Sequence, residues 1–200
     1  MKNLYNTKIT FCPGPGAVIP EWFDHQKEFF GRGDLEYDNI KKKTFSWLKK
    51  KCGQDNIIAV PGAATTASIV AINSFIEKNV LVIDTGFYSE RWLNYLKKTK
   101  IVGDVKSLKY EDFLQKKISN KYKWVIFVYV ETALCKKFDI KKVKKKCKRL
   151  DAKLFVDATA SVGLEKNHEY GDVVFFSSCK GLFGPTGLGF IGYKKNIKAK

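Results

Sequence analysis

Residues 173–187 read Val-Val-Phe-Phe-Ser-Ser-Cys-Lys-Gly-Leu-Phe-Gly-Pro-Thr-Gly. The uninterrupted apolar run at 173–176 predicts a strand buried on both faces, and the glycine-rich residues after it predict a loop. Lys180 stands at this junction, among small residues that cannot shield its charge from the core. A lysine removed from water loses its proton more readily and becomes a nucleophile. We therefore predict that Lys180 is a catalytic residue that forms a Schiff base.

Similar apolar runs recur outward from this stretch, with helical periodicity between them. They lie at 80–83, 124–130, 154–156 and 188–193, and the first three end at Asp84, Glu131 and Asp157. Apolar positions 140, 143, 147 and 150 have helical spacing, with Asp139 as a candidate N-cap. This alternation predicts an α/β fold, a three-layer α/β/α domain with a mainly parallel sheet. Ligands of such sheets gather beyond the carboxyl ends of the strands.

The composition favours one globular domain without a membrane span. The chain has 200 residues, 44% of them hydrophobic. No apolar run approaches the roughly 18 residues that a transmembrane helix needs. Residues 1–6 lack the apolar core of a signal peptide, so we expect a cytoplasmic protein.

The charge balance raises the question of a polyanion partner. The formal net charge is +17, from 37 Lys and Arg against 20 Asp and Glu. Only three of these cations are Arg, the residue whose planar fork reads phosphates and bases. Lysine runs at 41–43, 49–51 and 144–146 alternate with apolar positions and predict the solvated faces of helices. A basic nucleic-acid-binding module is therefore the less favoured alternative.

Cysteine and histidine do not indicate a metal site. The five cysteines, at 12, 52, 135, 147 and 179, have no metal-ligand spacing, and we expect reduced thiols. His25 and His168 have no catalytic neighbours in the sequence, and we expect both at the surface.

Asp157 is the second candidate catalytic residue. A lone aspartate at a strand end is more often a turn or helix-cap residue. The alternative is a carboxylate that faces a cationic ring nitrogen, as the pyridine of pyridoxal phosphate requires. Lys180 follows 23 residues later, a distance that returns the chain to a neighbouring strand end. The pair therefore indicates a cofactor site more strongly than either residue does alone.

Two further segments have the chemistry of a cofactor site. Residues 62–66, Gly-Ala-Ala-Thr-Thr, follow a strand-like run and open a small-residue helix, whose first amides can bind a phosphate. An ordinary capped helix is the alternative, and neither a Walker sequence nor a dinucleotide fingerprint is present. Beyond the run at 80–83, Tyr88 or Phe87 can stack on a flat ring or pack in the core.

Together these segments resemble the class V aminotransferases, which are pyridoxal-phosphate enzymes of fold type I. The matches are Pro-Gly-Pro at 13–15, Gly-Ala-Ala-Thr at 62–65, Thr-Gly-Phe-Tyr-Ser-Glu-Arg at 85–91, Glu-Thr at 131–132, Val-Asp-Ala at 156–158 and Ser-Cys-Lys at 178–180. The nearest subgroup resembles 2-aminoethylphosphonate–pyruvate and serine– or alanine–glyoxylate aminotransferases. The resemblance spans residues 11 to 193. It assigns residues 1–200 to the cofactor-binding large domain, with an N-terminal segment at 1–30 and the sheet and cofactor site within 55–195.

The resemblance implies a role for each matched residue. Lys180 holds pyridoxal 5'-phosphate as an aldimine and shuttles a proton, and Asp157 faces the ring nitrogen. The other cofactor-binding residues implied are Ala63, Ala64 and Thr65 at the phosphate, Tyr88 over the ring, Thr132 at the ring oxygen, Ser178 beside the lysine, and Thr186 toward a neighbouring subunit. The implied partners are a small amino donor, a 2-oxo acid and a second copy in a homodimer.

Departures from the family pattern leave alternatives open. Ala63 and Ala64 replace the usual Ser-Gly of the phosphate cradle, and Thr85 replaces an Asn. Family members continue into a small C-terminal domain that supplies an arginine for the substrate carboxylate. We expect that domain to be absent here and the chain to be a fragment. A catalytically inactive fragment and a pyridoxal-phosphate-dependent lyase, which shares the same lysine and aspartate, therefore stay open beside the aminotransferase.

Overall fold

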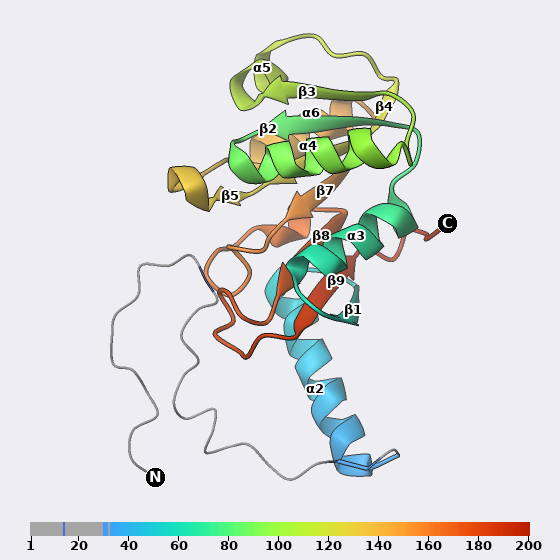
Figure 1. Cartoon of the computed structure of the whole chain (residues 1–200), viewed down its shortest axis with the longest axis vertical. Helices are drawn as coiled ribbons and strands as arrows, with labels where there is room; N and C mark the ends of the chain where they lie inside the picture. The colour runs from blue at the N-terminus through green and yellow to red at the C-terminus, as the bar shows by residue number, and fades with distance from the viewer. Residues whose placement is uncertain (1–13, 15–29, 32) are drawn as a thin grey trace.

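The computed structural model describes residues 14, 30–31 and 33–200. Its seven-stranded sheet has the order β1-β9-β8-β7-β4-β2-β3 (Figure 1). The strands are β1 (Asn56–Pro61), β2 (Asn79–Asp84), β3 (Val105–Lys109), β4 (Tyr122–Val128), β7 (Lys153–Asp157), β8 (Val173–Ser177) and β9 (Leu188–Tyr193). The main helices are α2 (Leu35–Cys52), α3 (Ala64–Phe75), α4 (Phe87–Thr99), α5 (Tyr110–Gln115) and α6 (Ile140–Arg149).

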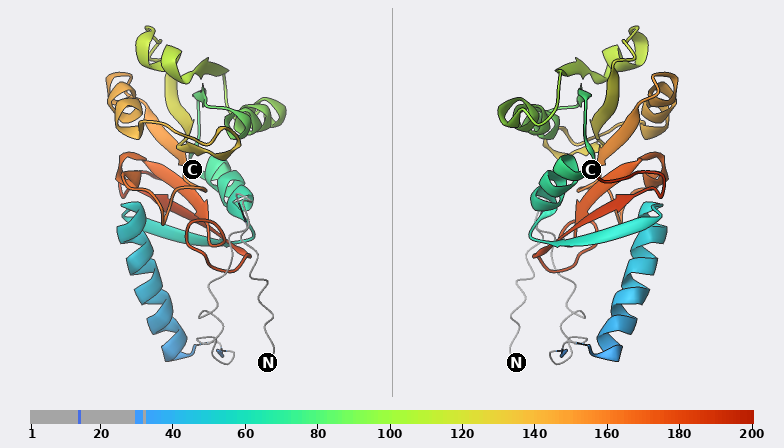
Figure 2. Two further views of the ribbon diagram at one scale, coloured as in Figure 1. Left: turned by 90° about the vertical axis from the view of Figure 1, so that its left-hand side faces the viewer. Right: turned by 90° about the vertical axis from the view of Figure 1, so that its right-hand side faces the viewer.

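The sheet is mainly parallel, as the apolar runs predict. Strands β3, β2, β4, β7 and β8 pair in parallel, and only β9 runs against its two neighbours, β8 and β1. Helices α3 and α4 cover one face, and α5, α6 and the C-terminal end of α2 cover the other (Figure 2). The prediction of a three-layer α/β fold is confirmed.

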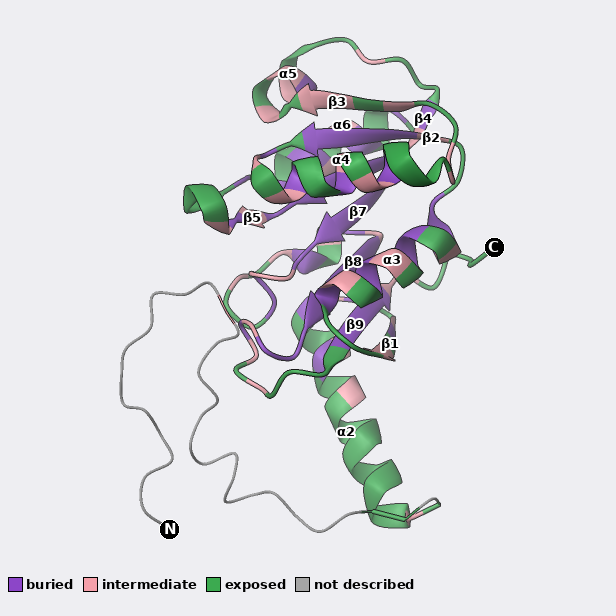
Figure 3. Cartoon of the chain, in the orientation of Figure 1, coloured by how far each residue is buried: buried purple, intermediate pink, exposed green. Residues whose placement is uncertain are grey.

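Alternating side chains of the central strands build a core on each face. On β4, Trp124, Ile126 and Val128 pack with α3 and α4, whereas Val125 and Phe127 pack with α5 and α6. Both sets are buried, and Figure 3 shows the strands as the buried centre of the molecule. Continuous apolar runs are thus needed because both faces of each strand exclude water.

The run at 124–130 does not form the single strand that its composition predicts. Strand β4 ends at Val128, and Tyr129 turns the chain: its amide donates to the Asp157 carbonyl, at 3.1 Å. A separate short hairpin then pairs β5 (Val130–Glu131) with β6 (Lys136–Lys137). The hairpin brings the residue after Glu131 to the carboxyl end of the main sheet.

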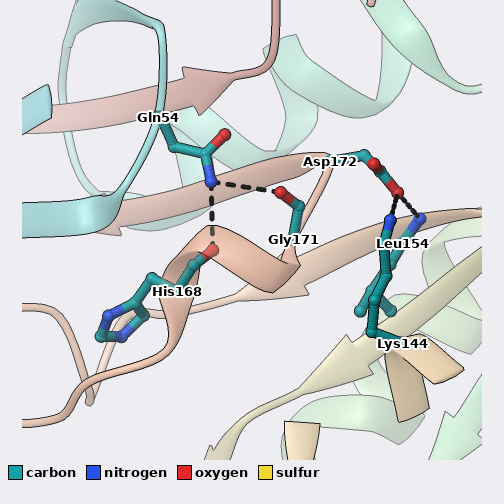
Figure 4. Close-up of polar contacts among 6 residues, drawn as sticks. All are labelled: Gln54, Lys144, Leu154, His168, Gly171 and Asp172. Atoms are coloured by element: carbon teal, nitrogen blue, oxygen red, sulfur yellow. Dashed lines mark hydrogen bonds and ion pairs between the residues drawn. The ribbon is translucent and has the colours of Figure 1, made fainter. Parts of the chain in front are cut away.

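Helix α6 begins and packs as its periodicity predicts. The Asp139 carboxylate accepts hydrogen bonds from the amides of Lys141 and Lys142, at 2.9 and 3.1 Å. The lysine run on this helix is not uniformly solvated, however. Lys144 is mostly buried and pairs with Asp172, whose carboxylate also accepts from the Leu154 amide at 2.6 Å (Figure 4). The ion pair ties α6 to the loop before β8.

His168, in the 3₁₀ turn η2 (His168–Tyr170), is buried and not at the surface as predicted. It is 1% exposed, and its Nε2 lies 2.9 Å from the Ser161 hydroxyl. The Gln54 side chain holds the turn by donating to the carbonyls of His168 and Gly171, at 3.0 and 3.1 Å (Figure 4). The prediction failed because burial of this turn depends on Gln54, 114 residues away. His25 lies outside the described residues.

We expect His168 to make the fold acid-sensitive. Burial lowers the pKa of His168 from 6.5 to about 4, so the unfolded chain binds a proton that the folded chain refuses. Stability is then lost as pH falls from 6.5 to 4, by about 3 kcal/mol. Denaturant unfolding of wild type and His168→Phe across this range measures it. The wild type should lose stability more steeply; parallel curves would show that the folded protein protonates the ring.

Helix α2 extends from the body of the fold (Figure 1). Only Leu48 and Cys52 of this helix are buried, and its lysine run at 41–43 is exposed, as the sequence predicts. Asp34 caps its start and Gly53, in the left-handed region, ends it. Among the helices that the structure describes, none has both the length and the apolar character required to cross a membrane.

Candidate functional site

A cavity of about 170 Å³ opens at the carboxyl ends of the parallel strands. Strands β7 and β8 are neighbours in the sheet, with Asp157 opposite Phe175, so the segments that follow them lie side by side. This is the edge at which α/β proteins bind ligands. Seven predicted site residues line the cavity: Ala63, Ala64, Thr65, Tyr88, Thr132, Asp157 and Lys180.

Lys180 is held by a compact turn after β8. The amide of Phe183 donates to the Lys180 carbonyl at 3.0 Å, and the amide of Gly184 donates to the Ser178 carbonyl at 2.9 Å. Gly181 makes the turn possible, since a Cβ there would lie 2.4 Å from the Val162 carbonyl oxygen. The Lys180 side chain is partly buried and lines the cavity. Lys180 is therefore part of the cavity wall.

Gly14 lies against the Lys180 side chain from the other end of the chain. A Cβ on Gly14 would lie 2.5 Å from Lys180 Cδ and 2.6 Å from Nζ. The backbone at Gly14 has a φ of +129°, a conformation that other residues rarely adopt. The flexible Lys180 side chain could move aside for a Cβ, so the positive φ is what favours glycine here, in agreement with the predicted Pro-Gly-Pro match. The other residues of that match lie outside the described residues.

Asp157 is a buried carboxylate at the cavity wall. It is 5% exposed; Oδ1 accepts from the Thr159 amide at 3.0 Å, and Oδ2 accepts from the Trp92 indole at 2.9 Å. Burial raises the pKa of Asp157, and the nearby charge of Glu131 raises it further, while the hydrogen bonds from Thr159 and Trp92 lower it. Four lone-pair positions on the two oxygens leave room for another donor from the cavity.

The N-terminus of α3 also lines the cavity and supplies hydrogen-bond donors there. Its N-cap is Ala63, which has no side-chain acceptor for the first amides of the helix. Arg91 Nη2 donates to Thr65 Oγ1 at 3.1 Å, and both residues line the cavity. A hydroxyl that accepts this bond keeps its own proton available for an anion. Backbone amides, a hydroxyl and a guanidinium therefore converge where an anionic group can bind.

Tyr88 and not Phe87 faces the cavity. Tyr88 is half-buried and lines it, whereas Phe87 is 63% exposed and does not. Buried Glu131 connects two segments that line the cavity. Its carboxylate accepts hydrogen bonds from the Tyr88 amide at 3.0 Å and from the Ala133 amide at 3.1 Å. The carboxylate thereby joins the start of α4 to the 3₁₀ turn η1 (Thr132–Leu134), which presents Thr132 to the cavity.

Two predicted cofactor-binding residues do not line the cavity. The Ser178 hydroxyl donates to the carbonyls of Pro185 and Leu188, so it closes the loop after β8. Thr186 is exposed in that loop. The role predicted for Ser178, beside the lysine, stays a prediction. The role predicted for Thr186 depends on a second subunit and stays a prediction.

Several cavity residues had no role in the sequence analysis. Arg91 belongs to the matched 85–91 segment, and its place in that pattern could have drawn attention to it. Trp92 has the spacing of an ordinary core residue, and nothing local indicates that its indole reaches Asp157, 65 positions away. Cys179 is buried against Ser177, with 3.7 Å between Sγ and the Ser177 hydroxyl oxygen, and it lines the cavity.

Comparisons with known proteins agree with this geometry. The family model described as Aminotransferase class-V matches residues 27–200. Alanine--glyoxylate aminotransferase 1 of Saccharomyces cerevisiae is 29% identical over 170 residues, which cover 76% of this chain and 44% of that protein.

Solved structures show the same fold. Pyridoxamine-pyruvate aminotransferase from Mesorhizobium loti has a TM-score of 0.82 and 18% identity, over 94% of this chain and 52% of that one. Alanine--glyoxylate aminotransferase from Nostoc sp. has a TM-score of 0.80 and 20% identity, over 92% of this chain and 52% of that one. The chain thus spans about half the length of these relatives.

Proposed function

Because this chain belongs to the aminotransferase class-V family, we propose that it is the cofactor-binding domain of a pyridoxal-phosphate-dependent aminotransferase. The observation that carries the proposal is one cavity lined by Lys180, the Asp157 carboxylate and the open start of α3. These groups match the three reactive parts of pyridoxal 5'-phosphate: an aldehyde, a basic ring nitrogen and a phosphate. Residues 1–200 would form this one domain, with the sheet and site within 55–195.

The donor set fits the cofactor at both ends. The first-turn amides of α3, the Thr65 hydroxyl and the Arg91 guanidinium would bind the phosphate dianion. The Asp157 carboxylate, which has an acceptor position beyond its bonds to Thr159 and Trp92, would accept a hydrogen bond from the protonated ring nitrogen. A cation there also favours the charged form of this buried acid. Tyr88 lines the wall between these ends, where an aromatic face can cover the ring.

Each residue then has a defined task in transamination. When bound, pyridoxal phosphate supplies an electron sink for the bond that breaks at the substrate Cα. Lys180 Nζ would attach the cofactor covalently through its aldehyde carbon and would move the proton at Cα as a general base and acid. Asp157 would hold the proton on the ring nitrogen. The expected substrates are a small amino donor and a 2-oxo acid, and alanine with glyoxylate, named for the yeast relative, is the first pair to assay.

Reconstitution tests the proposal directly. The purified protein is incubated with pyridoxal 5'-phosphate, and its visible absorption is recorded. The bond between the protein amine and the aldehyde carbon of the cofactor is then reduced with borohydride, and the labelled peptide is mapped. We expect the added mass on the peptide that contains Lys180. A colourless protein, or label spread over the exposed lysines of α2, would contradict the proposal. Assays of the same sample with amino donors then distinguish a working transaminase from an inactive domain or a lyase.

Arg91 should contribute to binding of the phosphate and not of the ring. We expect Arg91→Gln to weaken pyridoxal 5'-phosphate binding about 5-fold, the upper end for a solvent-exposed charge pair, because the guanidinium no longer holds Thr65 Oγ1. Affinity for pyridoxal, which lacks the phosphate, should not change. Fluorescence titration of both compounds measures the two affinities.

Arg149→Gln is the matched control, because Arg149 is an exposed arginine at the end of α6, outside the lining of the cavity. Equal weakening of phosphate and pyridoxal binding by Arg91→Gln would instead mean that Arg91 only supports the local fold.

A further inference from the structure

Trp92 is the one aromatic donor that reaches the Asp157 carboxylate in the described part of the chain. Its indole Nε1 lies 2.9 Å from Asp157 Oδ2, and the two residues are 3% and 5% exposed. Trp92 follows the matched 85–91 segment, so the family resemblance gives it no role. Its side chain lines the same cavity as Lys180. A buried hydrogen bond between a neutral donor and a carboxylate in this position calls for a functional explanation as well as a structural one.

Packing holds the indole in one orientation. Its ring meets Phe175 edge to face, with centroids 5.4 Å apart and an interplanar angle of 84°. Phe175 lies opposite Asp157 on the neighbouring strand, so the indole and the carboxylate share one rigid base. On the outer side, the Arg91 guanidinium lies 5.4 Å from the indole centroid. The donor is therefore in place before any ligand binds, as a preorganised site requires.

The hydrogen bond from Trp92 determines how the carboxylate is presented. Rotation about the last side-chain bond of an aspartate is broad, so one hydrogen bond leaves the plane of the carboxylate free to turn. Here the Thr159 amide holds Oδ1 and the Trp92 indole holds Oδ2. These bonds, together with a hydrogen bond from the Thr159 side chain, fix the plane and leave an acceptor position for a donor in the cavity.

We propose that Trp92 is a positioning residue that orients the Asp157 carboxylate toward the protonated ring nitrogen of pyridoxal phosphate. This inference rests on the proposed function. Loss of the indole donor removes one of the hydrogen bonds that hold the plane of the carboxylate and lets the carboxylate turn away from the ring.

The groups around Asp157 also make its pKa depend on Trp92. Glu131 on β5 and burial raise the pKa of Asp157, and the Trp92 and Thr159 bonds oppose them. Lys180 from the loop after β8 and Arg91 on α4 are the cations that line the same cavity. Without the indole donor the pKa of Asp157 rises further, and the acid limb of cofactor binding moves to higher pH.

The test measures the affinities of two ligands for the wild type and for variants at two tryptophans, Trp92 and Trp124. The ligands are pyridoxal 5'-phosphate and its deaza analogue, in which a C–H group replaces the ring nitrogen. Trp92→Phe should reduce the wild-type preference for the natural cofactor by about 10-fold, the loss of one hydrogen bond to a charged group. Binding of the deaza analogue should stay at the wild-type level, because it has no ring N–H to meet the carboxylate.

Trp124→Phe is the matched control. Trp124 is 2% exposed and belongs to the same buried cluster as Trp92, but it lies outside the cavity. It should cost stability without changing the ratio of the two affinities. If Trp92→Phe folds poorly, benzothienylalanine at position 92 keeps the shape of the indole and removes only the N–H.

The possible results distinguish a failure of the positioning role of Trp92 from a failure of the proposed function. A wild-type affinity ratio in the Trp92 variants overturns the role of Trp92 while the proposed function stands. No binding of pyridoxal 5'-phosphate to the wild type, under conditions in which the protein is folded, overturns both. A reduced ratio, together with an acid limb shifted to higher pH, supports the positioning role.

Discussion

Lys180→Ala is expected to abolish the visible absorption of the reconstituted protein while the fold is retained. The amine of Lys180 is the proposed nucleophile in the cavity that Asp157 also lines, and alanine leaves nothing to attach an aldehyde. Transaminase turnover, where the wild type shows it, should fall by at least the 10²–10⁴-fold or so that general acid–base catalysis contributes. Visible spectroscopy, borohydride labelling and a turnover assay measure the three effects.

The loss should be specific to covalent attachment. Lys180 is only partly buried and begins a turn that backbone hydrogen bonds close, so alanine there should leave the unfolding midpoint near the wild-type value. Lys145→Ala on the exposed face of α6 is the matched control and should keep the spectrum. A persistent chromophore in Lys180→Ala, with label at another lysine, would move the catalytic role to that residue.

Asp157→Asn is expected to lower turnover and cofactor affinity without lowering the stability of the fold. The amide cannot hold a positive charge on the ring nitrogen, so turnover should fall on the order of 10²-fold or more, as when a preorganised electrostatic partner is removed. Affinity for pyridoxal 5'-phosphate should fall too, while affinity for the deaza analogue should change little.

In the cofactor-free protein, Asp157→Asn should increase the free energy of unfolding, although it lowers turnover and cofactor affinity in the reconstituted protein. Burial raises the pKa of Asp157, so the unfolded chain releases this proton at a lower pH than the folded chain. Ionised Asp157 therefore costs stability, and that cost grows as pH rises above the ordinary aspartate pKa of about 3.9. The unfolding free energy of Asp157→Asn, relative to wild type, should thus increase as pH rises above about 3.9.

Asp84→Asn is the control for both measurements, because Asp84 also ends a strand but is exposed and does not line the cavity. A difference between Asp157→Asn and wild type that does not vary with pH would mean that the buried carboxyl is equally ionised in the folded and unfolded chains.

Local sequence determined the elements and their order. Continuous apolar runs became β2, β7, β8 and β9, because strands covered on both faces need apolar side chains throughout. The Asp139 cap and the apolar stripe of α6 were equally readable, since both depend on residues within one or two turns. The pairing of Asp157 with Lys180 at neighbouring strand ends also followed, because a 23-residue return favours adjacent parallel strands.

Predictions about single side chains failed where the neighbours are distant in sequence. His168, predicted at the surface, is buried under a turn that Gln54 holds. The apolar run at 124–130 divides at Tyr129, because its amide pairs with the carbonyl of Asp157. None of these contacts leaves a periodic trace in the local sequence.

For the candidate site, too, part could be predicted from the sequence and part only from the tertiary structure. The sequence alone predicted a nucleophilic lysine, a strand-end carboxylate and a helix start with open amides, because each prediction depends on short-range composition. Only the tertiary structure decided which groups surround them: Arg91 at Thr65, Trp92 at Asp157 and Gly14 at Lys180. The physical reason is that the sheet order brings β7 and β8 beside α3 and α4, and the partners of a buried polar group are set by that packing and not by adjacent residues.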